Sequence, residues 1–324
     1  MTDDATAQVL RLAHLLSTDV SEIAFLGEVD AQSLRELHGL IADVLFDTEG
    51  KGLGTLQGAA KALPPQITAK VAEKALGPVL CGRIAGSVDP ALAVSISKRL
   101  PNAFLADVAG HVHPDQVQAI VSRLPSSQVL AAADVLVNRG DLVALGHFSS
   151  IIKESTLRTL VASLDDATLL DIAPFIEPIE RTSQVISLIE DPNLISILRS
   201  AHGADRWVDA FDLVVRLDVP IRTRIASLVV PEAELIDGAL RSAAEHDRWA
   251  SLLEFTVHAK GVPERHWSDI DAFYDKDLME ACFDAAERDG LWGQVALLLS
   301  LWPEDLRKQL AKMVNAKTRK KLHL

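Results

Sequence analysis

Hydrophobic positions along this chain recur at the three- and four-residue spacing of an amphipathic helix. Leu34, Leu37 and Ile41, for example, fall on one face of a helix with 3.6 residues per turn. A half-buried strand would instead alternate apolar and polar residues between Asn-Gly or Asp-Gly turns, and such segments are hard to find. The pattern therefore predicts an all-α protein.

The clearest feature of the sequence is an internal repeat in its C-terminal part. The tetrapeptide Leu-Arg-Ser-Ala at 198–201 recurs at 240–243, and the Asp-Arg-Trp at 205–207 recurs at 247–249, both with an offset of 42 residues. A looser third copy at 285–289 is followed by a tryptophan one position late. Each copy continues into an apolar helix and then a proline. A period near 42 residues with two helices per unit is typical of a solenoid of helical hairpins.

A single hairpin of this kind cannot bury its apolar faces, so neighbouring hairpins are expected to stack and share one core. The tryptophan of each copy is expected to lock the turn between the two helices into that core. Asp205 and Asp247 are suited to cap the second helix of their hairpins.

The middle of the chain has a shorter rhythm, in which Leu-Pro pairs at 63–64, 100–101 and 124–125 each precede a short apolar helix, and Leu-Asp-Asp at 164–166 takes an equivalent place. This alternation, over roughly residues 63–200, resembles the superhelical intracellular N-terminal domain of MgtE-type magnesium transporters, which is similar to the repeats of the flagellar switch protein FliG. The resemblance implies a right-handed stack of short helices used for contacts or regulation. It does not imply transport, because neither a pair of CBS domains nor a transmembrane bundle is recognisable.

Together these rhythms predict a right-handed α-solenoid, a superhelix of stacked helical hairpins, in three segments. They are an N-terminal helical region with a Gly-rich linker (1–62), MgtE- and FliG-like short-helix repeats (63–197), and three hairpins of about 42 residues with a basic tail (198–324). The Gly-Lys-Gly-Leu-Gly run at 50–54 is superficially like a phosphate-binding loop. It follows a helical pattern rather than a strand, and the P-loop spacing is absent, so we expect a linker.

Charge narrows the classes of partner. The formal net charge of −13 disfavours general nucleic-acid binding, which requires a basic face. Residues 201–306 hold 21 acidic and 10 basic groups, whereas 307–324 hold seven basic groups and no acidic one. We therefore expect the repeats to bind a basic protein or peptide. For the tail two interpretations stay open: contact with anionic lipid or nucleic acid, or a solvated helix that caps the repeats.

The repeated Asp-Arg-Trp is a second candidate for recognition, because tryptophan and arginine dominate binding hot spots. Its repetition at equivalent positions favours a structural role, since a solenoid reuses the same residues to build the same turn. The candidate partner-binding residues from this motif and from the tail are Arg206, Trp207, Arg248, Trp249, Trp292, Lys317, Arg319, Lys320 and Lys321.

Two further features bear on chemistry. His111, His113 and Asp115 are candidate metal ligands, but zinc and nickel sites need three or four converging ligands, and the alternative is that the histidines lie at a helix end. HExxH, GxSxG and Cys-centred nucleophile motifs are absent. We therefore expect a non-enzymatic protein that needs no cofactor.

The resulting hypothesis is an adaptor or scaffold that binds a protein or peptide through an acidic helical-repeat surface. A cation- or small-molecule-responsive regulatory module is the first alternative, and an enzyme with a site between helical layers is the second. Cys81 and Cys282 are the two cysteines, far apart, and neither a signal peptide nor a long apolar run is apparent. These features predict a cytoplasmic location.

Overall fold

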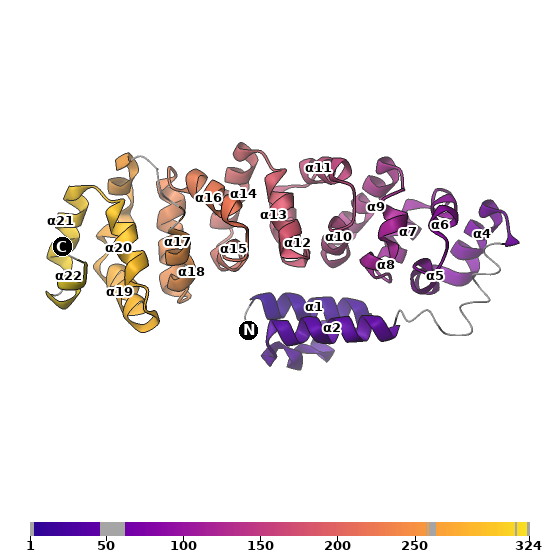
Figure 1. Cartoon of the computed structure of the whole chain (residues 1–324), viewed down its shortest axis with the longest axis horizontal. Coiled ribbons are helices and arrows are strands. Elements are labelled where there is room, and N and C mark those ends of the chain that lie inside the picture. Colours follow the sequence, from indigo (N-terminus) through magenta and orange to yellow (C-terminus); the bar gives the residue numbers. More distant parts are fainter. Residues whose placement is uncertain (1–2, 46–61, 257, 259–263, 315, 323–324) are drawn as a thin grey trace. The chain divides into compact units, whose positions relative to one another are not determined.

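All the elements in the described part of the chain are helices, and no strand occurs there, as the hydrophobic pattern predicts. The structure is a computed structural model, and Figure 1 shows its helices in chain order. The contacts between helices group the chain into two compact units, unit 1 (Met1–Arg181) and unit 2 (Thr182–Leu324). The segment boundary expected at 197/198 falls within one helix. The structure describes residues 3–45, 62–256, 258, 264–314 and 316–322, which leaves the Gly-rich run at 50–54 outside the described residues.

Unit 1 begins with a pair of helices, α1 (Asp3–Leu16) and α2 (Ala31–Leu45), joined by two short 3-10 helices, η1 (Val20–Glu22) and η2 (Ala24–Glu28). We call residues 3–45 the N-terminal hairpin. The two helices lie side by side (Figure 1), and their shared core is formed by Ala5, Val9, Leu12 and Leu34.

The rest of unit 1 is a series of short helices, and α1 packs against two of its elements, α10 and η4. In chain order the elements are α4 (Pro65–Val71), the π-helical η3 (Ala72–Leu76), α5 (Gly77–Ala85), α6 (Pro90–Ser97), α7 (Asn102–Ala109), α8 (Pro114–Val121), α9 (Ser126–Arg139), α10 (Leu142–Ser149), α11 (Glu154–Ser163), α12 (Asp166–Ile172) and η4 (Ala173–Phe175).

The Leu-Pro pairs mark helix starts, as the sequence predicts. Pro64, Pro101 and Pro125 are the residues directly before α4, α7 and α9. Proline disfavours a helical conformation in the residue before it, so each pair separates one helix from the next. Before α12 the same place is taken by Asp165, whose carboxylate accepts the backbone N–H of Thr168 at 2.7 Å.

Unit 2 contains the three hairpins that the repeat predicts. The first helices are α14 (Asp191–Gly203), α17 (Ala233–Glu245) and α19 (Lys276–Asp289), and each contacts the next in this series. The second helices also contact one another in series and are α15 (Trp207–Val214), α18 (Trp249–Thr256) and α20 (Trp292–Ser300).

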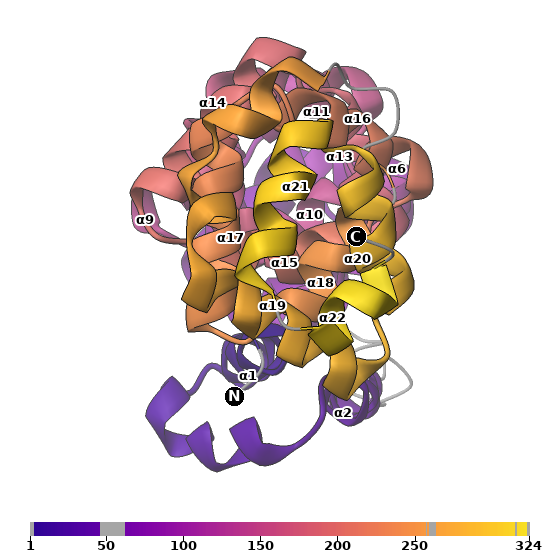
Figure 2. The same cartoon turned by 90° about the vertical axis from the view of Figure 1, so that its left-hand side faces the viewer.

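The other elements of unit 2 are α13 (Ile179–Ser187, which starts in unit 1), α16 (Val219–Val229), η5 (Glu264–Asp269), η6 (Asp271–Tyr274), α21 (Glu304–Met313) and α22 (Ala316–Leu322). The last two of these, α21 and α22, face the viewer in Figure 2.

The turn inside each of the three hairpins is built in the same way. Asp205, Asp247 and Gly290 all adopt left-handed backbone conformations, with φ of 54°, 51° and 72°. The next residue then donates its backbone N–H to a carbonyl five residues earlier, which is the bond that ends a helix in a Schellman motif. These bonds are Arg206 to Ala201 (2.8 Å), Arg248 to Ala243 (2.9 Å) and Leu291 to Ala286 (2.9 Å).

This turn corrects two expectations. Asp205 and Asp247 end the first helix of their hairpins and do not cap the second, because a residue in the left-handed region cannot also hold the extended backbone of an N-cap. In the third copy Gly290, not Asp289, occupies the place of Asp247. The offset there is 43 residues, so Trp292 is not late and begins its helix as Trp249 does.

A substitution at Gly290 tests the left-handed turn. A Cβ at this position would meet no atom within 4 Å, so Gly290→Ala adds backbone strain only and should lower the free energy of unfolding by about 1 kcal/mol. Gly293→Ala is the matched control, because it lies inside α20 with equal space and should be neutral or stabilising. Urea unfolding followed by tryptophan fluorescence measures both, and equal effects would contradict the left-handed turn.

Candidate functional site

Many acidic side chains of unit 2 form ion pairs with arginines of a neighbouring hairpin. The partners are 33 to 41 residues apart, so each arginine joins consecutive units of the repeat. Exposed pairs of this kind contribute about 0–1 kcal/mol each, and their main effect is to fix the register of adjacent helices. They are Arg224–Asp191 (2.5 Å), Arg199–Glu232 (2.6 Å), Arg288–Asp247 (2.9 Å), Arg248–Asp212 (3.1 Å) and Arg241–Asp275 (3.5 Å).

Five carboxylates of unit 2, Asp247 among them, gather at or just beyond the C-terminal ends of the first helices, α14, α17 and α19. We call this set the acidic edge, and it consists of Asp205, Glu245, Asp247, Glu287 and Asp289, all exposed. The C-terminal end of a helix already carries partial negative charge, so carboxylates there add to that charge instead of offsetting it. The 2.9 Å contact between Arg288 and Asp247 shows that adjacent turns are neighbours along this edge.

Cations meet only part of the acidic edge. Arg288 contacts Asp247 and Asp289, and Lys321 pairs with Glu287. Hydrogen bonds from Arg288 lower the pKa of Asp289. Within the described residues no ion pair reaches the carboxylates of Asp205 or Glu245.

The tryptophans of the repeated motif are buried, and its arginines are half-buried in ion pairs. Trp207 and Trp249 are 5% and 2% exposed, and the Trp207 Nε1–H donates to His202 Nδ1 at 3.2 Å. Arg206 pairs with Asp209 at 2.7 Å, and Arg248 with Asp212 at 3.1 Å. These side chains are engaged in building the repeat, which is the structural role that their repetition favours.

Trp292 and the tail meet at the last hairpin. Trp292 is half-buried, and its Nε1–H donates to Glu287 at 2.8 Å. The Nζ of Lys321 lies 4.7 Å from the centre of the Trp292 ring, a cation–π contact. Arg319 and Lys320 are exposed, with Arg319 Nη2 donating to the carbonyl of Val314, and the side chain of Lys317 lies outside the described residues. The contact of α22 with α20 thus fits the capping interpretation of the tail.

Unit 1 holds a polar contact that sequence reasoning missed. Gln8 and Arg11 of α1 are 1% and 2% exposed, and both reach Glu177, which follows η4. Arg11 forms an ion pair with Glu177, and Gln8 Nε2 donates to Glu177 Oε1 at 3.2 Å. These residues are about 170 positions apart, and no local motif signals such a pairing. The N-terminal hairpin is therefore held to the helices of unit 1 by an ion pair between a buried arginine and a partly exposed glutamate.

Two partly buried histidines lie next to this pair. The rings of His38 in α2 and His147 in α10 are 6.0 Å apart. Burial lowers the pKa of His38 to about 4, helped by the charge of Arg11, and it lowers the pKa of His147 well below its usual range. Both imidazoles are consequently neutral at pH 7, as a site beside a buried guanidinium requires.

The depressed pKa of His38 predicts acid sensitivity. The unfolded chain takes up a proton near pH 6.5 and the folded chain only near pH 4, so stability is intact above pH 6.5 and is lost as the pH falls between these values. After allowance for the half-exposed ring, we expect a loss of about 2 kcal/mol. Hydrogen exchange of α1 and α2 in the full chain, at pH 7 and pH 5, measures it. His38→Gln should flatten this dependence, and an unchanged slope would contradict it.

The candidate metal ligands are not brought together. His111 follows the C-terminus of α7, where positive charge suits the helix dipole, whereas His113 directly precedes α8, where it does not. His113 Nδ1 lies 3.8 Å from Asp115 Oδ2. Among the described residues, no three His, Cys, Asp or Glu side chains are grouped to hold a metal ion.

His111 instead lines a polar cavity of about 370 Å³ under α1. Here His14 Nδ1 is 3.7 Å from Asp141 Oδ1, and Arg139 is paired with Asp107. Burial lowers the pKa of His111, and the nearby His14 acts in the same direction. The cavity thus holds the ion pair of Arg139 with Asp107 and the contact of His14 with Asp141.

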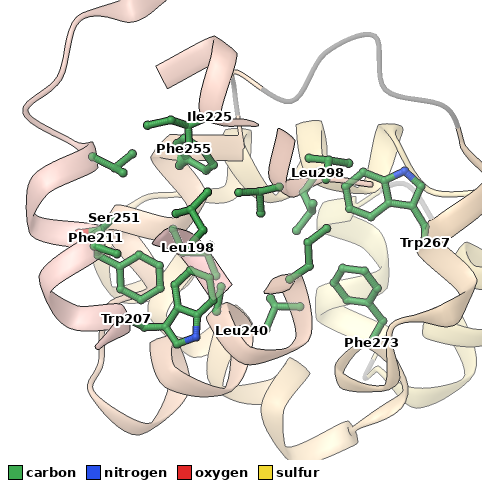
Figure 3. Close-up of a pocket in the computed structure, with 17 residues that line it drawn as sticks. Leu198, Trp207, Phe211, Ile225, Leu240, Ser251, Phe255, Trp267, Phe273 and Leu298 are labelled. Carbon is green, nitrogen blue, oxygen red and sulfur yellow. The ribbon is translucent and has the colours of Figure 1, made fainter. Parts of the chain in front are cut away.

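Two other cavities are almost wholly apolar. In unit 2 a cavity of about 80 Å³ lies between Trp207 and Phe211 on one side and Trp267 and Phe273 on the other (Figure 3), and Ser251 supplies the only hydroxyl among the side chains that line it. In unit 1 a cavity of about 150 Å³ lies among α5 to α11. Neither brings together the acid and base groups that catalysis requires.

The fold itself defines the class of this chain, an all-α protein that contains helical hairpins in series. No protein-family model, curated protein or solved structure matches the chain. Within the described residues, no helix combines the length and apolar character that crossing a bilayer demands.

Proposed function

We propose that this protein is a non-enzymatic adaptor whose helical hairpins stack into a right-handed solenoid, as the resemblance to the MgtE N-terminal domain implies, and bind a basic segment of another protein. The acidic edge of unit 2 carries this proposal. Its carboxylates stand at the negative ends of three neighbouring helices, where they weaken the fold. Asp205 and Glu245 stand there without an ion pair among the described residues, and residues that break a local rule without such compensation are the ones expected to serve a ligand.

The edge also offers charge that is not used within the described part of the chain. Asp205 and Glu245 are exposed and carry no ion pair there, whereas the arginines around them are held by other carboxylates. A basic peptide would meet these carboxylates and the aligned helix ends together. Complementary charge of this kind raises association rates and selects against acidic partners.

Unit 1 supplies a precedent within the same chain. Its helices hold α1, a helix from elsewhere in the sequence, through an arginine that meets a carboxylate. The proposal for unit 2 requires the same chemistry, with lysine or arginine from a partner facing the acidic edge. Helical repeats present broad surfaces for such contacts and need no pocket.

A charge-reversal pair tests the proposal. The full chain, tagged at its endogenous level, is crosslinked in cells, and the partners are identified by mass spectrometry. Asp205→Lys with Glu245→Lys should reduce recovery of a basic partner about tenfold, and raised salt should weaken the wild-type complex. Glu190→Lys with Asp218→Lys makes the same change of charge at two exposed carboxylates away from the edge and should leave binding intact. Equal loss in both variants, or no enriched partner, would refute the role of the edge.

A second candidate, the small-molecule-responsive module, is favoured by one observation, the cavity of about 150 Å³ in unit 1. No described feature favours an enzymatic function in the same way.

A further inference from the structure

The cavity of unit 1 exists because its walls are built from small side chains. Five alanines line it, from α5, α6, α7 and α9, together with branched aliphatic residues and Phe148. Interiors are normally packed to the density of organic crystals, so a space of about 150 Å³ is a departure from ordinary packing. A cavity of this volume with aliphatic and aromatic walls can stay dry and take up a molecule of the size of benzene.

One polar side chain in the wall, Gln128, has only one of its two amide atoms in a hydrogen bond. Gln128 of α9 donates from Nε2 to the backbone carbonyl of Ser97 at 2.7 Å. A carbonyl can only accept, so this bond fixes the orientation of the amide and leaves Oε1 as the remaining acceptor. Gln128 Oε1 is buried and has no hydrogen-bond partner among the described residues. Such an orphaned acceptor is costly, and a ligand that donates to it recovers the lost bond.

Few polar groups line this cavity. Besides Gln128, the polar side chains in its wall are Ser97 and Ser149, and Ser149 donates its hydroxyl to the carbonyl of Gly146 at 2.6 Å. The wall thus combines a largely apolar volume with Gln128 Oε1, an acceptor that has no partner among the described residues.

We propose that this cavity is a binding site for a small aromatic molecule with one hydrogen-bond donor, of the class of phenol. The ring fills the space between the alanines, and the hydroxyl donates to Gln128 Oε1. The site lies wholly within unit 1 and does not depend on the acidic edge of unit 2, so it goes beyond the adaptor function.

The cavity of unit 2 provides an internal comparison. It is smaller, at about 80 Å³, and Ser251 is its only side chain with a hydroxyl or amide group. It has no amide acceptor equivalent to Gln128 Oε1 and offers about half the volume. A ligand of the proposed class should therefore select the cavity of unit 1.

The test uses the full chain and three probes of similar size: phenol, anisole and benzene. Isothermal titration should give a dissociation constant for phenol about tenfold below those of anisole and benzene, which cannot donate. Gln128→Leu should raise the phenol value to that of benzene and leave benzene binding in place. Ser251→Leu, in the other cavity, should change neither value.

Variants that fill the cavity of unit 1 show whether the probes bind there or elsewhere on the protein. Ala132→Leu places additional methyl groups in the cavity and should abolish binding of all three probes; Ala109→Leu serves if that variant does not fold. Circular dichroism checks folding in each case. Equal affinity for phenol and benzene in the wild-type chain, absence of binding by all three probes, or retention of binding after the cavity is filled would overturn the proposal.

Discussion

Trp249→Ala is expected to lower the free energy of unfolding of unit 2 by about 3–5 kcal/mol, the largest effect that we expect from any single substitution in this chain. Trp249 begins α18, the second helix of the central hairpin, and is only 2% exposed. Removing the indole deletes a large apolar surface and leaves a void that a repeat packed on both sides cannot close.

Intrinsic fluorescence makes this measurement specific to unit 2, because all five tryptophans lie there. Urea unfolding followed by fluorescence therefore reports unit 2, while far-ultraviolet circular dichroism reports the helices of both units. Trp292→Ala is the matched control, since Trp292 begins the equivalent helix of the next hairpin but is half-buried. It should cost clearly less, about 1–2 kcal/mol. Equal losses would mean that burial does not govern the role of this tryptophan.

The helical class and the hairpins were within reach of sequence analysis because their signals are local. Periodicity places Leu34 and Leu37 against α1. The proline of each Leu-Pro pair is an equally local signal, and it marks the start of a helix. Leu40 and Val44 show the limit, since they satisfy the same spacing and are 66% and 78% exposed. A helical period identifies a face, but the partner of that face decides which of its positions are buried.

The prediction that Asp205 and Asp247 cap the second helix was wrong for a different reason. Aspartate is common as an N-cap, and only occasionally takes the left-handed conformation that Asp205 and Asp247 adopt. The third copy held the clue, since the glycine at 290 is typical of a left-handed helix end. Aligning the copies on that glycine would have shown the 43-residue offset.

Charge was visible in the sequence, but its pairing was not. The excess of acidic residues over 201–306 could be counted, whereas the pairs that consume much of it, such as Arg288 with Asp247, join residues about 40 positions apart. The acidic edge emerges only when the carboxylates are placed at the ends of their helices. The cavity in unit 1 could not be predicted at all, because single alanines are ordinary in helices and a void depends on how five of them converge.

Glu177→Ala is expected to loosen the N-terminal hairpin from unit 1, with a cost of about 3 kcal/mol. It removes the carboxylate that pairs with Arg11 and accepts from Gln8, two side chains that are almost fully buried. Removing Glu177 leaves the buried charge of Arg11 desolvated without this partner, which costs more than the pair contributes. Hydrogen exchange of residues 3–16 in the full chain measures the loss and should quicken by about a hundredfold.

Two companion variants separate charge from shape. Glu154→Ala removes an exposed carboxylate that pairs with Arg158 at 3.2 Å, and it should change stability by less than about 0.5 kcal/mol. Arg11→Met combined with Glu177→Leu removes both charges of the pair, and it should restore most of the protection of α1, because no buried charge is then left without its partner. Slow exchange of α1 in Glu177→Ala would show that apolar packing against α10 and η4, rather than the charge pair, holds the N-terminal hairpin in place.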